Sequence, residues 1–119
     1  LMSRHPEYNI NLTETHHTQK KDAPSGTAIS LAEDIVEEIP SLKNWVNNES
    51  NSTEALGIIS LRIDPAPGTH QVKYSSSIDD ILLIHTAHNR EGFAKGALIA
   101  AEYNKNKKGV FNMKDVLGI

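Results

Sequence analysis

The chain has 119 residues, a net charge of −3, 38% hydrophobic residues and no cysteine, which allows one compact domain with a modest core. The small charge gives no reason to expect nucleic-acid or membrane binding, and no apolar run approaches the roughly 20 residues that span a bilayer. Disulfides and thiolate metal sites are excluded. These properties fit a cytoplasmic enzyme or binding module.

The N-terminal half predicts a strand, a loop and a helix. Residues 1–7 are interpreted as a linker or as the end of a helix. Residues 8–15 alternate apolar and polar side chains, as a half-buried strand does. Residues 25–39 carry apolar side chains at helical spacing. Residues 40–55 are rich in asparagine and serine, which indicates a loop or a weak helix around Trp45.

The second half predicts three strands followed by helical segments. The three strand runs are residues 58–63, 70–75 and 81–88. Asn89 is suited to cap a second helix, and Gly109 is suited to stop it. Residues 111–117 form a short terminal helix or a tail.

The resulting order, β-α-β-β-β-α, predicts an α+β fold. We expect a mainly antiparallel or mixed four-stranded sheet with helices on one face. Residues 81–84 are apolar on both faces of their strand. A strand buried on both sides needs a second covering layer, so we expect a partner subunit's sheet there and a homo-oligomer.

Residues 14–28 join the first strand to the first helix and hold the most reactive side chains. His16 and His17 are adjacent, and Lys20 lies four residues after His16. Since neighbouring residues of a strand point to opposite faces, only one of the two histidines is expected to enter a given site. An imidazole beside an ammonium group suits proton transfer next to an anion.

The start of the predicted helix adds anion-binding groups to this loop. Asp22 or Ser25 can cap the helix, Gly26 lets backbone approach a ligand closely, and Thr27 supplies a hydroxyl. Free N–H groups and the helix dipole favour anions at this end. The segment therefore predicts a site for a carboxylate or a phosphate.

The pattern Glu-x-His-His-x-x-Lys-x-Asp-Ala-Pro-Ser-Gly-Thr-Ala resembles the signature of the dihydrodipicolinate reductases of bacterial lysine biosynthesis. The resemblance covers nearly the whole chain and roughly the C-terminal half of such an enzyme. It implies a glyceraldehyde-3-phosphate-dehydrogenase-like C-terminal domain, spanning residues 1–119, that binds substrate and joins four sheets into a tetramer, or two into a dimer. Residues 105–119 resemble the tail that docks on the N-terminal dinucleotide-binding domain.

The resemblance also implies roles for individual residues. The matched positions are His16 as proton donor, Lys20 as second catalytic residue, His17 as a substrate contact, and Ser25, Gly26 and Thr27 as the loop that binds the carboxylates. Arg90 and Phe93 match a segment near the junction with the cofactor domain. The substrate implied is a small cyclic imine with two carboxylates, reduced with NADPH or NADH in the lysine and diaminopimelate pathway.

The proposed chemistry is consistent with these residue types. A dianion needs a lysine and several N–H donors, and a reduction that adds hydride also needs a positioned acid. A bound dianion favours protonated His16, whereas Lys20 disfavours it. The chain has no Gly-x-Gly-x-x-Gly, and no parallel βαβ unit is expected, so we expect no cofactor bound to these residues alone.

Two other functions remain open: a non-catalytic homo-oligomerisation module and a metal-dependent hydrolase. Within a strand, His16 is expected to point to the opposite face from His17, and His85 to the opposite face from His88. Because neither pair shares a face, we expect no metal site. His70 is interpreted as a structural loop residue. The roles of His85 and His88 are not assigned.

Overall fold

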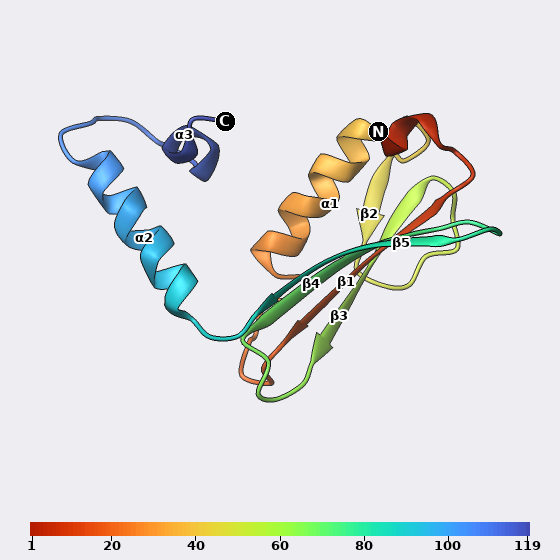
Figure 1. The fold of residues 1–119 in the computed structure, drawn as a ribbon, viewed down its shortest axis with the longest axis horizontal. Coiled ribbons are helices and arrows are strands. Elements are labelled where there is room, and N and C mark those ends of the chain that lie inside the picture. The colour runs from red at the N-terminus through yellow and green to blue at the C-terminus, as the bar shows by residue number, and fades with distance from the viewer. The chain divides into compact units, whose positions relative to one another are not determined.

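The computed structural model describes residues 1–119 as two compact units, Leu1–His88 and Asn89–Ile119 (Figure 1). The first unit contains a short 3-10 helix, five strands and one α-helix. In chain order they are η1 (Met2–Arg4), β1 (Asn9–His16), α1 (Gly26–Glu38), β2 (Asn44–Val46), β3 (Ala55–Arg62), β4 (Gly68–Ser75) and β5 (Asp80–Ala87). The second unit contains α2 (Glu91–Asn104) and α3 (Met113–Leu117).

The five strands form one mixed sheet in the order β2-β3-β1-β4-β5, with β1 in the centre. β1 runs parallel to β3 and antiparallel to β4, β2 is parallel to β3, and β4 is antiparallel to β5. The α+β prediction is confirmed. The expectation that no parallel βαβ unit exists is wrong, because α1 lies between the parallel strands β1 and β3 in the sequence.

The sheet has five strands instead of the four predicted. The additional strand is β2, which lies where a loop or weak helix was expected, around Trp45. It pairs with Ala55–Gly57 of β3 and forms one edge of the sheet. Three residues are too few to show a period, and asparagine is depleted in strands, so only the pairing with β3 reveals this strand.

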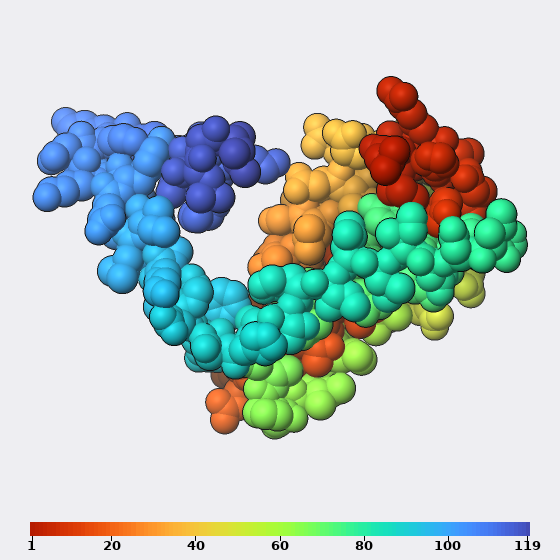
Figure 2. Space-filling view, viewed as in Figure 1, coloured from red at the N-terminus to blue at the C-terminus, as the bar shows by residue number.

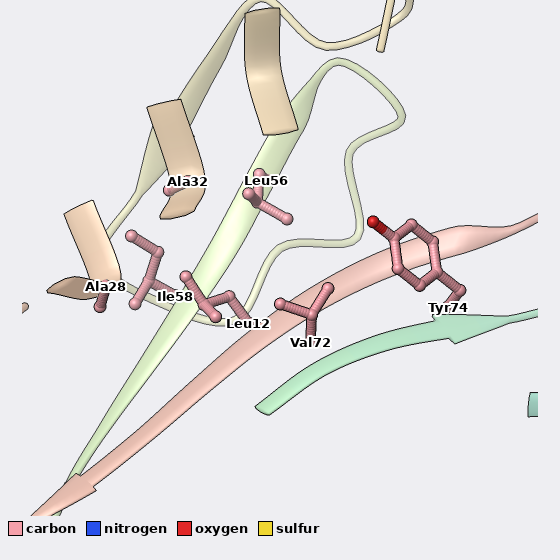
Figure 3. Packing of buried hydrophobic residues seen from close by; sticks show 7 residues of the cluster. All are labelled: Leu12, Ala28, Ala32, Leu56, Ile58, Val72 and Tyr74. Carbon is pink, nitrogen blue, oxygen red and sulfur yellow. The ribbon is translucent and has the colours of Figure 1, made fainter. Parts of the chain in front are cut away.

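The core lies between α1 and one face of the sheet (Figure 3). Leu12, Leu56 and Ile58 are completely buried and point toward α1. Ala28 and Ala32 of the helix are also completely buried, and their small side chains let the helix lie close to the strands. This packing fixes the start of α1 over the carboxyl end of β1, which is where the motif residues lie.

The second unit departs from the sequence prediction at both ends of α2. The N-cap is Arg90 and not Asn89, although the Asn89 side chain accepts a hydrogen bond from the Glu91 amide at 2.9 Å. The helix ends at Asn104, five residues before Gly109, and Lys107 lies 3.0 Å from the centre of the Tyr103 ring. The predicted terminal helix is present as α3, with a capping box at its start.

β5 forms the second edge of the sheet and carries exposed apolar side chains on both faces. They are Ile81, Leu82, Leu83 and Ile84, each of which is 40–61% exposed. Figure 2 shows this strand, in turquoise, as a strip at the surface of the first unit. None of the helices combines the length and the apolar character required to cross a bilayer.

Candidate functional site

A row of polar side chains crosses the sheet near the carboxyl end of β1. The strand register places four residues opposite one another, namely Ser60, Glu14, His70 and His85. The next residue on the same face of β1 is His16, which lies opposite Arg62 of β3. Four strands therefore contribute to one cluster, and α1 begins beside it.

Glu14 is the centre of this cluster and is completely buried. Its Oε1 atom accepts hydrogen bonds from the Ser25 amide at 3.0 Å and from Arg62 Nη2 at 3.1 Å. Burial raises the pKa of the Glu14 carboxyl, but the neighbouring polar groups of Ser25, Ser60 and Arg62 outweigh burial and hold the pKa below its usual range. Glu14 is therefore a buried, ionised carboxylate.

The second carboxylate oxygen faces two imidazoles. Glu14 Oε2 lies 3.0 Å from His16 Nδ1 and 3.9 Å from His70 Nε2. The 3.0 Å contact has the distance of an ion pair but not the angle of a hydrogen bond, so Oε2 and Nδ1 are both buried without a hydrogen-bond partner. The two rings meet edge to face, with centroids 5.2 Å apart.

His70 is not the loop residue that the sequence indicated. It lies within β4, and its Nε2 is 3.1 Å from the Ser25 hydroxyl at the start of α1. Burial lowers the pKa of His70, and nearby His16 lowers it further. Burial also lowers the pKa of His16; Glu14 opposes this effect, while Lys20 reinforces it.

These directions predict that acid destabilises the first unit. The unfolded chain protonates His16 and His70 near their ordinary pKa of 6.5, whereas the folded chain does so only at lower pH. Stability is therefore lost as the pH falls below 6.5, and the lowered pKa of Glu14 removes more below its ordinary value of 4.5. We expect the free energy of unfolding in urea to be smaller at about pH 5.5 than at about pH 7.5.

A pair of variants separates this cluster from histidines in general. His70→Gln should reduce the difference in unfolding free energy between the two pH values, because one buried imidazole is removed. His88→Gln, at an exposed position, should leave the difference unchanged. Equal or greater stability at the lower pH would contradict the assignment of buried, neutral imidazoles.

Two side chains hold the loop that carries Lys20. Arg62 donates to the Lys20 carbonyl from Nε at 3.2 Å and to the Asp22 carbonyl from Nη2 at 2.6 Å. Asp64 accepts from the Thr18 amide at 3.0 Å and from the Thr18 hydroxyl at 2.6 Å. The Lys20 ammonium group lies 2.9 Å from both carboxylate oxygens of Asp22. The loop backbone is thus held at several groups, whereas the Lys20 ammonium group pairs with Asp22 of the same loop.

The start of α1 offers two free amides to a ligand. Ser25 is the N-cap, its hydroxyl accepts from the Ala28 amide at 3.2 Å, and its own amide is used by Glu14. Gly26 and Thr27 are exposed, and first-turn amides have no acceptor within the helix. Ser25 therefore caps the helix and donates to Glu14, which leaves the amides of Gly26 and Thr27 free at this helix start.

Within the first unit, the structure brings His16, Lys20 and the start of α1 together. His17 follows the end of β1 and is partly exposed, in contrast to buried His16. Arg90 and Phe93 belong to the second unit, and their role stays a prediction. Sequence reasoning missed Glu14, Arg62 and His70 as members of the site. The signals available in the sequence were Gly68-Thr69-His70 for His70 and the first position of the motif for Glu14.

The cluster offers metal-binding atoms but has the wrong electrostatics for a cation. Donor atoms of Glu14, His16 and His70 lie within 4.8 Å of one another. The sequence-based expectation considered only histidines within one strand and missed the pair of His16 on β1 and His70 on β4. However, the Arg62 guanidinium already neutralises Glu14 at 3.1 Å, and Lys20 acts on both imidazoles. We assign no metal to these residues.

A cavity of about 590 Å³ lies at the other end of β1. Its lining includes Tyr8 and Ile10 from the start of that strand, together with Leu42 and Tyr74. None of the clustered titratable residues lines it. The chemistry-bearing groups thus lie outside this cavity, on the end of the sheet where α1 begins.

Comparison with known proteins agrees with the geometry. Residues 1–117 match the family model described as "Dihydrodipicolinate reductase, C-terminus". The chain belongs to the dihydrodipicolinate reductase family. The resemblance seen in the sequence is therefore confirmed, and the chain corresponds to the C-terminal part of these reductases.

Curated relatives in this family carry the name 4-hydroxy-tetrahydrodipicolinate reductase. The 4-hydroxy-tetrahydrodipicolinate reductase of Christiangramia forsetii is 50% identical over 117 residues, which cover 98% of this chain and 48% of that protein. The reductase of Methanosarcina barkeri is 39% identical, with 95% of this chain and 44% of that protein covered. The chain thus spans about half the length of the curated relatives it matches.

A solved structure shares the fold. The dipicolinate-bound dihydrodipicolinate reductase from Paenisporosarcina sp. TG-14 superposes with a TM-score of 0.58 and 26% sequence identity. The match covers 85% of this chain and 40% of that one.

Proposed function

We propose that this chain forms the substrate-binding and oligomerisation part of an NAD(P)H-dependent reductase. The reaction is the reduction of dihydrodipicolinate to tetrahydrodipicolinate in the diaminopimelate route to lysine, in the cytoplasm. The observation that carries the proposal is the convergence of buried His16, Lys20 and the exposed start of α1. Dipicolinate, which is bound to the related Paenisporosarcina reductase, is a dicarboxylate of the same class as this substrate.

Each group has a defined task in substrate binding. The amides of Gly26 and Thr27 bind one carboxylate, aided by the dipole of α1. Lys20 binds a carboxylate by exchanging its ion pair with Asp22 for one with the substrate. His17, beside the same loop, is proposed as a further substrate contact.

His16 supplies the proton. In the free chain, burial lowers the pKa of its imidazole. A bound dianion raises this pKa, so substrate binding draws in the proton that the reaction consumes.

The residues of this chain do not fit a nicotinamide dinucleotide. The first turn of α1 lacks the glycine fingerprint, and the Ser25 amide is occupied by Glu14. We therefore place the hydride-donating cofactor, NADPH or NADH, outside residues 1–119. Arg90, Phe93 and residues 105–119 are proposed to face the part of the enzyme that binds it.

The exposed side chains of β5 support a homo-oligomer, a tetramer or a dimer formed through the sheet. An apolar edge strand is a template for pairing with another copy. We expect sedimentation to show an oligomer for the unmodified chain and a shift toward monomer for Leu83→Glu, which places a charge on a side chain that is 61% exposed.

The comparison needs a matched surface change. Lys43→Glu, at a side chain that is 68% exposed and away from β5, should leave the oligomeric state unchanged. A monomeric unmodified chain would contradict the interface. The same surface favours the second function considered, a non-catalytic oligomerisation module.

Turnover in the full-length protein distinguishes these functions. Freshly generated dihydrodipicolinate should cause oxidation of NADPH or NADH, which is measured as the loss of cofactor absorbance. An oligomer that binds dipicolinate but oxidises neither cofactor would contradict the reductase and support the module.

A further inference from the structure

Glu14 is a charged side chain that has no part in the proposed mechanism, yet it is completely buried. Removing a carboxylate from water is costly unless its charge is paired and its oxygens are hydrogen-bonded. Oε1 meets this condition, because it accepts from the Ser25 amide and from Arg62. Those two bonds fix the carboxylate in place and leave Oε2 to be explained.

Oε2 faces His16 Nδ1 at 3.0 Å, and neither atom has another hydrogen-bond partner. The distance suits a hydrogen bond, and a rotation of the imidazole would supply the missing angle. Hydrogen bonds of catalytic groups are often poorly aligned before substrate binds. The unpartnered Oε2 and Nδ1 atoms are thus what a carboxylate that positions an imidazole would look like before substrate binds.

We propose that Glu14 is a positioning residue that holds a proton on Nδ1 of His16, so that Nε2 is the nitrogen that exchanges the proton with substrate. The inference rests on the proposed function, in which His16 is the acid. A buried carboxylate bonded to one imidazole nitrogen fixes the tautomer and the ring orientation, and it stabilises the imidazolium.

Among the charged groups around His16, Glu14 is the one that favours a proton on the ring. Around His16 lie Arg62 from β3, His70 from β4, His17 and Lys20 from the loop after β1, and the positive end of α1. All of these disfavour a positive charge on the His16 ring. Glu14 opposes them, and Arg62 bonded to the other oxygen keeps the carboxylate ionised.

The tautomer can be measured directly in the unmodified chain. Long-range nitrogen–proton NMR spectra identify which imidazole nitrogen carries the proton, and the His16 signal is assigned by its loss in His16→Gln. We expect the Nδ1–H form of His16 at a pH above its pKa. An Nε2–H form would overturn the proposal without any variant of Glu14.

Glu14→Gln adds a functional readout. The variant should lower the pKa of His16, weaken the Nδ1–H preference, and in the full-length reductase reduce kcat by about 10- to 100-fold with KM little changed. The decline of kcat with rising pH should move to lower pH, because His16 loses its proton earlier. Glu54→Gln, which removes an exposed carboxylate paired with Lys43, is the matched control and should change none of these.

The outcomes separate the two proposals. A folded Glu14→Gln with the wild-type tautomer, pKa and pH profile would overturn the positioning role while leaving the reductase intact. A wild-type protein without reductase activity would overturn the proposed function, whereas the tautomer of His16 would still be decided by the spectrum.

Discussion

His16→Ala is expected to lower kcat of the full-length reductase by about 10²- to 10⁴-fold, the usual loss when a general acid is removed. KM should change far less, because the proposed carboxylate contacts are Lys20 and the start of α1. The measurement is cofactor oxidation at saturating dihydrodipicolinate, over a range of pH.

Two neighbouring positions act as controls for this result. His17→Ala should reduce kcat less, since His17 is partly exposed and lies outside the buried pair with Glu14. Lys20→Ala should impair both kcat and KM. Lys20→Arg should not restore them fully, because the planar guanidinium group of arginine differs in shape from the compact ammonium group of lysine. If His17→Ala abolished turnover while His16→Ala kept it, the roles within the pair would be reversed.

Arg62→Met is expected to reduce the free energy of unfolding of the first unit by about 3–5 kcal/mol, the cost of leaving a buried charge without its partner. Glu14 is completely buried, so loss of the guanidinium removes its counter-ion as well as one hydrogen bond. The Lys20 and Asp22 carbonyls lose their donor too. Urea unfolding at neutral pH provides the measurement.

Lys43→Met is the matched control for this prediction. Lys43 pairs with Glu54 at 2.6 Å, but both side chains are well exposed, so the pair should contribute less than about 1 kcal/mol. Equal effects of the two substitutions would show that Arg62 does not neutralise a buried carboxylate. A stable Arg62→Met protein with an altered Lys20 loop would show that the backbone bonds matter more than the charge.

The motif residues could be predicted from sequence because they are close along the chain. His16, Lys20 and the Ser25 cap lie within a short segment whose strand and helix periods are clear, and the structure confirms Ser25 as the N-cap. Glu14 belongs to the same segment, but its burial depends on the packing of α1 and could not be inferred from a local pattern.

The partners of Glu14 could not be predicted because they depend on strand register. Arg62 and His70 are far from Glu14 in sequence and meet it only through the pairing of β1 with β3 and β4. A shift of one residue would turn either side chain to the other face. β2 escaped prediction for the same reason, since its pairing and not its composition makes it a strand.

Lys20 and the start of α1 are proposed to form a dicarboxylate site beside His16. Titration of the chain with dipicolinate, followed by amide NMR, tests it directly. We predict saturable shifts at Gly26 and Thr27, weakened strongly in Lys20→Gln and unchanged in Lys43→Gln. Benzoate, with one carboxylate, should bind more weakly. Shifts confined to other residues, or equal binding by Lys20→Gln, would contradict the site.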